Sequence, residues 1–412
     1  DFESSLKMYE SLEGKNSDRY TYVLPSYSFT KNFFLRDYDG SFNLSSYGDN
    51  TISDTNISST VINNNLSYNS LDFYTNAGIT TNHNFFLKNI NSMSDKSVKY
   101  KDTPQSELMS AYMFDVSLPL QKKTKDRQST LKPRFNFRIS PHDMKYHSNT
   151  SSRIDVKNVF SSNRLSLADS FETGESLTLG IEFKKEKISQ INKVVEIEGV
   201  GIDYKNLTTK EIKKKLKGVS DFKKEKITEI EDYIDFKLAT VLRLNQQKNI
   251  PLNSTLNKKN SNIFGLVGYK PTKDTSLQYD FSLTSDLNVF EHQAITASYI
   301  TENFSTDFSF TEETGILGDT NIVSNVTKLI DFKDFHNLSF STRRNRKINL
   351  TEYYDIIYEY KNDCLIAAIK YRKDYYKDND IIPKEELFFS LTIVPFYTFS
   401  PDKMILNKNR ID

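Results

Sequence analysis

The sequence predicts an all-β protein, a transmembrane antiparallel β-barrel with about 18 strands within this chain. Apolar and polar residues alternate with a period of two along most of the sequence, as they do in strands that expose two different faces. Very short connectors alternate with longer polar ones, like the turns and loops of outer-membrane barrels. The 24 Tyr and 29 Phe, against 10 Pro and 13 Gly, also favour strands.

The alternation is clearest in the segments from Leu131 to Ile139, Leu177 to Phe183 and Leu277 to Leu283. Each segment places an apolar row on one side of a strand and a polar row on the other. We expect the apolar row to face lipid and the polar row to face the barrel lumen. The expected strands cover approximately 4–12, 20–33, 40–48, 57–74, 78–90, 107–120, 130–140, 175–184, 234–245, 262–270, 275–284, 292–300, 303–311, 321–330, 336–344, 352–361, 364–372 and 386–395.

The connectors predict the topology. If the chain of a single barrel ends in the periplasm, counting back from strand 386–395 makes every second connector extracellular. The insertion 186–233 then lies in the periplasm. The expected extracellular loops are 141–174, 312–320, 345–351 and 373–385, and the expected periplasmic turns are 271–274, 301–302 and 362–363.

Charge and composition exclude several functions. With 55 basic and 54 acidic residues, the net charge of +1 gives no footprint for nucleic acid. No apolar run approaches the roughly 18–20 residues of a membrane helix. None of the five His has a His or Cys at metal-ligand spacing, and no nucleophile elbow occurs. We therefore expect no cofactor, no metal and no enzyme. A soluble β-sandwich is the structural alternative, but such domains usually close within about 100 residues.

One region breaks the alternation. Residues 186–233 are rich in Lys and Glu and carry helical signals: Thr208 and Glu211 form a capping box, and Gly218 stands at a C-cap position. Ser220 could cap a second short helix. The sequence predicts a small helical insertion here, either a solvated hairpin or a docking element for a periplasmic partner.

Three groups of motifs resemble the LPS-assembly family LptD, also called OstA. The first is the loop from Arg153 to Gly174, where Ser170 replaces the usual Asp and Glu175 replaces a second Gly. The second is the order Asp115 to Leu120, Leu131 to Pro133 and Ser140-Pro141. The third is the pattern that ends Tyr360-Lys-Asn-Asp-Cys364, followed by strand 386–395. The residues that match the family loop are Asp155, Asn158, Phe160, Asn163, Arg164, Glu172 and Gly174.

The resemblance implies a function and a location. It implies an integral protein of the bacterial outer membrane that inserts lipopolysaccharide into the outer leaflet through the barrel lumen and a lateral seam. Residues 1–412 would form one barrel domain, the later part of a larger barrel, and the family's periplasmic N-terminal domain would lie outside this chain. The alternative is a porin or another substrate-specific outer-membrane transporter.

The resemblance also implies partners and particular residues. The implied partners are lipopolysaccharide, an LptE-like lipoprotein plug in the lumen, and periplasmic Lpt bridge components that dock through the N-terminal domain. The resemblance implies that Cys364, which has no cysteine partner in this chain, forms a disulfide with a cysteine of that domain; the alternative is a free thiol buried in the barrel wall. The seam strand would carry Leu387, Phe389, Leu391, Ile393 and Pro395.

Overall fold

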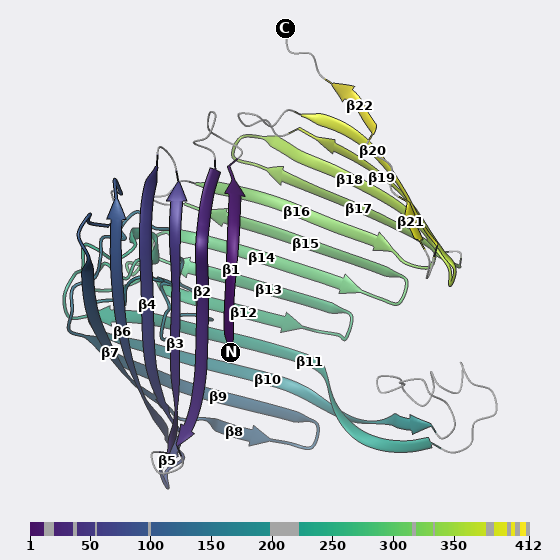
Figure 1. The fold of residues 1–412 in the computed structure, drawn as a ribbon. Coiled ribbons are helices and arrows are strands. Elements are labelled where there is room, and N and C mark those ends of the chain that lie inside the picture. The colour runs from purple at the N-terminus through teal and green to yellow at the C-terminus, as the bar shows by residue number, and fades with distance from the viewer. Residues whose placement is uncertain are drawn as a thin grey trace.

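The computed structural model describes residues 1–11, 20–35, 39–53, 56–97, 100–197, 222–314, 319–332, 334–375, 383–393, 397–399 and 404–408. Over these residues the chain forms one sheet of 22 strands, with a short 3-10 helix, η3 (Leu252–Ser254), in one loop (Figure 1). No helix in the described part of the chain has the length and apolar character to cross a membrane.

Eighteen strands are long, and each overlaps one of the segments predicted from the sequence. They are β1 (Phe2–Glu10), β2 (Tyr20–Leu35), β3 (Gly40–Ser53), β4 (Ile57–Ser70), β6 (Thr80–Asp95), β7 (Gln105–Ser117), β9 (Arg127–Ser140), β10 (Gly174–Ile197), β11 (Phe222–Arg243), β12 (Ile263–Lys270), β13 (Thr275–Leu283), β14 (Phe290–Ile300), β15 (Phe304–Glu313), β16 (Thr320–Leu329), β17 (His336–Asn345), β18 (Leu350–Lys361), β19 (Leu365–Asp374) and β20 (Lys384–Ile393). Four short strands were not predicted separately: β5 (Phe73–Tyr74), β8 (Leu120–Lys123), β21 (Tyr397–Phe399) and β22 (Met404–Lys408).

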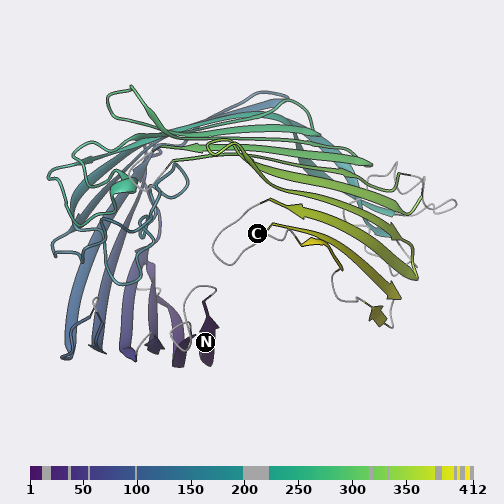
Figure 2. The same ribbon diagram turned by 90° about the horizontal axis from the view of Figure 1, so that it is seen from above.

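Each long strand pairs antiparallel with the next one along the chain, while β5 pairs with β6 and β8 with β9. The sheet curves strongly, so that its N-terminal and C-terminal strands stand at the two ends of an arc (Figure 2). Within the described residues β1 pairs with β2 alone, and the sheet does not close into a ring. The all-β antiparallel prediction is confirmed, whereas the membrane setting stays a prediction.

The two faces of the sheet differ as the alternation predicts. Phe137, Leu179 and Phe308 lie on the outer face and are exposed, each at 38–39%. Arg138 and Thr178, their neighbours in sequence, are almost fully buried on the inner face, which carries the loop between β9 and β10. Cross-strand partners share a face, so the pairing extends this separation across the sheet.

The helical insertion expected at 186–233 is wrong wherever the structure describes it. Strands β10 and β11 continue their ladder from Ser176↔Arg243 to Ile197↔Phe222, well beyond their neighbours (Figure 1). Ile and Val are frequent here and favour strands, and each strand already satisfies the backbone of the other. The expected caps Thr208, Glu211, Gly218 and Ser220 lie outside the described residues.

The expected closing strand, 386–395, corresponds to β20, but it is not the last strand. Strand β21 pairs with its C-terminal part, from Leu391 to Ile393, and β22 pairs with its start, from Lys384 to Leu387. An edge strand offers unpaired backbone groups, and these two short strands take up some of them. Pro395 lies outside the described residues.

Candidate functional site

Two loops fold onto the inner face of the sheet and hold each other there. Residues 141–173 connect β9 to β10, and residues 244–262 connect β11 to β12. The backbone N–H of His147 donates to the Asn249 carbonyl at 2.9 Å, and the Asn249 side chain donates to the Met144 carbonyl at 2.9 Å. The Ser152 N–H donates to the side-chain oxygen of Asn253 at 3.0 Å. The two loops therefore form one packed unit.

Short polar side chains shape the 141–173 loop from within. The Asp155 carboxylate accepts hydrogen bonds from the N–H groups of Lys157 at 2.7 Å and Asn158 at 3.0 Å. The Asn158 side-chain oxygen accepts in return from the Asp155 N–H at 2.9 Å. The Asn163 amide bonds both the N–H and the carbonyl of Leu167, each at 3.1 Å. Such side-chain bonds replace the ladder partners that a loop backbone lacks.

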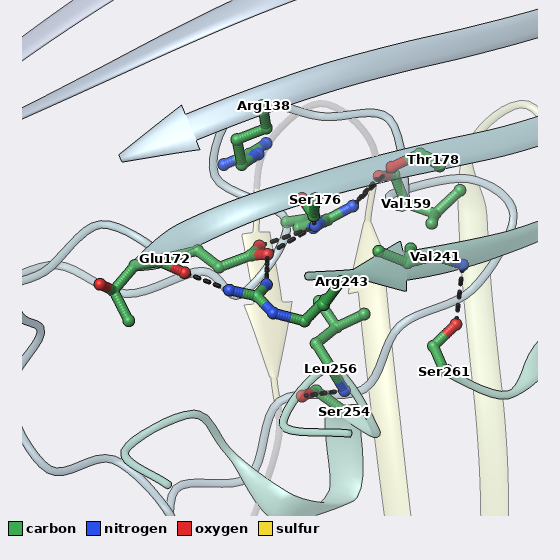
Figure 3. Close-up of polar contacts among 12 residues, drawn as sticks. Arg138, Val159, Glu172, Ser176, Thr178, Val241, Arg243, Ser254, Leu256 and Ser261 are labelled. Carbon is green, nitrogen blue, oxygen red and sulfur yellow. Dashed lines mark hydrogen bonds and ion pairs between the residues drawn. The ribbon is translucent and has the colours of Figure 1, made fainter. Parts of the chain in front are cut away.

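A buried ion network joins this loop to the strands (Figure 3). Arg164 donates from Nε and Nη2 to the two oxygens of Glu172, both at 2.6 Å. Arg164 also donates to the Thr178 hydroxyl at 2.8 Å and the Ser176 hydroxyl at 3.0 Å on β10. Arg243, on β11, donates to Glu172 and to the carbonyl of Thr173. The paired geometry of a guanidinium and a carboxylate fixes both the distance and the orientation of the loop.

A third arginine and an aromatic ring complete the attachment to β9 and β10. Arg138, on β9, donates to the carbonyls of Ser161 and Ser162 at 2.7 and 2.8 Å. The Phe160 ring lies 4.1 Å from the Arg134 guanidinium carbon. A Cβ at Gly180 would stand 2.6 Å from that ring, so only glycine leaves room for Phe160 on this strand.

Apolar side chains fill the space beneath the network. Ile154, Val159 and Leu165 from the first loop pack with Ile250 and Leu256 from the second, and all five are at most 3% exposed. Val241 of β11 and Phe264 of β12 form the floor of this cluster. Arg164, Glu172 and Arg243 are themselves at most 5% exposed, and the apolar cluster holds both loops in place.

The same loop reaches the N-terminal strands. The Ala168 carbonyl accepts hydrogen bonds from the Lys88 ammonium of β6 at 2.8 Å and from the Tyr47 hydroxyl of β3 at 3.0 Å. The Phe171 ring lies against Phe86 and beneath the Lys88 ammonium. Inside the loop, His147 and Asp169 are 3.0 Å apart and nearly buried. The loop therefore connects β9–β12 with β3–β7 across the inner face.

The network changes the ionisation of Glu172. Burial alone would raise the pKa of this carboxyl group, but the charge and hydrogen bonds of Arg164, with Arg138 and Arg243 behind, hold the pKa well below its usual range. Glu172 therefore stays ionised at any physiological pH. The arrangement presents no accessible nucleophile or base to a substrate, and the described residues contain no group of three His, Cys, Asp or Glu arranged to hold a metal ion.

The structure brings the seven expected loop residues together. Asp155, Asn158, Asn163, Arg164 and Glu172 bond within the loop, Phe160 packs on Gly180, and Gly174 begins β10 with a φ of +81°, which favours glycine. The sequence did not reveal the roles of Arg243 and Lys88. Arg243 stands in an apolar segment, and Lys88 bonds Ala168, which lies far away in the sequence.

The other expected site residues lie elsewhere. Cys364 is exposed in the turn between β18 and β19, and its N–H donates to the Asn362 side chain at 2.9 Å. Leu387, Phe389, Leu391 and Ile393 of β20 share the outer face with Ile369 of β19. Neither group contacts the buried network, so the candidate residues form separate regions rather than one site.

Comparison with known proteins agrees with this description. A family model described as "LptD: LPS transport system D" matches residues 85–321, more than half of the chain. The match spans β7, both inward-folded loops and all seven loop residues. No curated protein matches the chain.

Glu172→Gln is expected to destabilise the protein by about 3–5 kcal/mol, because it leaves two buried guanidinium groups without an ionised partner. Thermal unfolding in detergent micelles, with protease cleavage within 141–173, measures the effect. The matched control is Glu182→Gln, because Glu182 is 37% exposed and 3.9 Å from Arg134, and should cost less than about 1 kcal/mol. Equal losses in the two variants would contradict a special role for the network.

Stability should also fall in acid in a way that depends on Glu172. Because its folded pKa lies below the ordinary value of 4.5, the stabilisation is fully present above that pH and is lost as the pH falls through the folded pKa. Between pH 5 and about pH 3 the melting temperature of the wild type should drop more steeply than that of Glu172→Gln. Parallel curves would show that Glu172 is not the group that titrates.

Proposed function

Because the chain belongs to the LptD family, which serves lipopolysaccharide transport, we propose that it is an outer-membrane translocon subunit that inserts lipopolysaccharide into the outer leaflet. The proposal places the chain in the bacterial outer membrane, with the outer face of the sheet against lipid. The sugar part of the substrate passes along the inner face, and its acyl chains leave through a lateral seam.

The observation that carries the proposal is the two-faced sheet. Leu179, Phe308 and Ile369 are 39–46% exposed on the outer face. Contact of these apolar side chains with water is unfavourable, whereas contact with lipid is not. Each long strand from β2 to β19 pairs with a neighbour on both sides, so its backbone groups find partners within the sheet, as a hydrocarbon environment requires. A polar inner face suits an amphiphile whose sugars need water or polar contacts.

Strand β20 is the proposed border of the seam. Its outward side chains Leu387, Phe389, Leu391 and Ile393 offer an apolar surface for acyl chains, while Ser390 and Thr392 face inward. Within the part of the chain that the structure describes, its second edge pairs with the short strands β21 and β22, over three and four residues. A short pairing costs less to separate than a long one. This edge of β20 can therefore open more easily than the pairing between two long strands.

The inner face also suggests where partners bind. The two inward loops occupy the region over β9–β12, so a lipoprotein plug would contact the inner face beside them. The β10–β11 hairpin extends beyond its neighbours, and the proposed topology places it in the periplasm, together with the turns at 271–274, 301–302 and 362–363. The loops at 141–174, 312–320, 345–351 and 373–385 then belong to the extracellular side.

Depletion of the protein in the bacterium that encodes it should reduce newly made lipopolysaccharide at the cell surface, measured by the access of an impermeant antibody to its sugars. Re-expression of the full-length protein should restore surface exposure. Normal surface lipopolysaccharide in depleted cells would contradict the proposal. A large, constant conductance of the protein in liposomes would instead favour the alternative function of a porin.

We also propose that Cys364 forms a disulfide with a periplasmic domain of the full-length protein, because the thiol is exposed in a turn on the proposed periplasmic side. Oxidised and reduced full-length protein should then migrate differently in a gel, and Cys364→Ser should abolish the difference. Identical migration of the two wild-type forms would contradict the bond.

A further inference from the structure

The inner face of β18–β20 carries a set of ion pairs beside the proposed seam. The Asp355 carboxylate lies 3.4 Å from the Lys370 ammonium and 3.7 Å from the Arg372 guanidinium. Arg372 also donates from Nε to Asp374 at 2.7 Å. On the neighbouring strand, Lys384 and Glu386 are 2.8 Å apart. We call Lys370, Arg372 and Lys384, with their carboxylate partners, the β18–β20 ladder.

The strand pairing places this ladder on the same face as the buried network. Thr178 pairs with Val241, and the series continues through Phe264, Ser282, His292, Glu313 and Thr320 to Arg343, Tyr353 and Asp374, with only even steps inside each strand. Cross-strand partners share a face, and so do alternate residues of one strand. Arg372 pairs with Glu386, so the ladder reaches β20.

Within every pair of the ladder the cation is more exposed than the carboxylate. The Lys370 and Arg372 side chains are 34% and 35% exposed, and Asp355 between them is 12% exposed. Asp374 and Glu386 are also the more buried members of their pairs. The carboxylates form a floor that holds the cations, and the N–H donors of the cations form the surface that a ligand meets first.

Cation donors over a buried acidic floor suit an anionic ligand rather than a metal ion, whose ligands would be the carboxylates. Arg372 donates to Asp374, and its guanidinium carbon lies 4.9 Å from the centre of the Tyr353 ring, so two contacts restrict the position of the guanidinium. A positioned guanidinium binds phosphate or carboxylate oxygens in pairs. Lys370 and Lys384 add point charges on both sides of it.

Building on the proposed function, we propose that the β18–β20 ladder binds the phosphate groups of lipopolysaccharide on their way to the seam. It holds the junction between sugar and acyl chains at the inner side of β20, whose outer side is apolar. The amphiphile would then straddle one strand, with its anionic part inside and its acyl chains outside.

The test uses photo-crosslinking in the full-length protein. Phe388 pairs with Lys370 and lies on the inner face, so its replacement by p-benzoylphenylalanine changes little and places the probe beside the ladder. With the variant Lys370→Gln/Arg372→Gln, the yield of lipopolysaccharide adduct should fall by about 3–10-fold, as expected for lost charged hydrogen bonds. Arg372→Lys alone should give an intermediate yield, because lysine keeps the positive charge but loses the paired hydrogen bonds.

The matched control is Lys373→Gln. Lys373 lies on the same strand, pairs with Glu385 on the opposite face, and is 35% exposed. Its adduct yield should equal that of the unchanged protein. If the variant Lys370→Gln/Arg372→Gln assembles poorly, the second measurement uses purified protein with the crosslinker at position 388 and the ladder unchanged. This protein is placed in liposomes with either intact or enzymatically dephosphorylated lipopolysaccharide. Dephosphorylation of lipopolysaccharide should lower the adduct yield about as much as the change Lys370→Gln/Arg372→Gln.

The outcomes separate this inference from the proposed function. An equal yield with dephosphorylated lipopolysaccharide would overturn the phosphate site. Absence of any adduct at Phe388 in cells that still export lipopolysaccharide would also overturn it, and would leave the proposed function intact. Cells that keep surface lipopolysaccharide after depletion of the protein would instead refute the proposed function.

Discussion

The separation of apolar and polar side chains onto two faces is the constraint on which the rest of the structure depends. Because the strands satisfy each other's backbone groups, the faces differ only through their side chains. Small side chains on the inner face leave room for loops to pack against the sheet. Ser176, Thr178 and Gly180 on β10, with Ala239 and Val241 on β11, provide such a region, and the two inward loops occupy it.

The buried ions determine how that region is used. An arginine–carboxylate network with no access to water gives little net stability, but it penalises any other arrangement of the loop strongly. Glu172 satisfies Arg164 and Arg243 at once, and Arg138 binds the loop backbone beside them. The loop then holds the Ala168 carbonyl at the distance that Lys88 and Tyr47 require. The loop that the network holds therefore ties two distant parts of a curved sheet together.

The sequence predicted the strands well because a period of two is a local signal, as in Leu277 to Leu283. It singled out the loop residues through a resemblance to the LptD family. The family match confirms the family, while the role of these residues stays a prediction. The prediction from sequence failed at 186–197 and 222–233, because Lys- and Glu-rich residues near cap-like signals fit a helix locally, whereas the strand pairing that decides the outcome there is not local. It also missed Arg243 and Lys88, whose partners lie 71 and 80 residues away in the chain.

The most direct test of the two-faced sheet in its proposed membrane is a nitroxide scan along β15, from Phe304 to Glu313, in protein reconstituted into liposomes. Collision rates with oxygen, which concentrates in lipid, and with a water-soluble nickel complex report the surroundings of each position. The account predicts a period of two, with oxygen favoured at Phe308 and Phe310 and nickel favoured at Asp307 and Ser309. Collision rates that vary smoothly along the strand, or that favour nickel at every position, would contradict it.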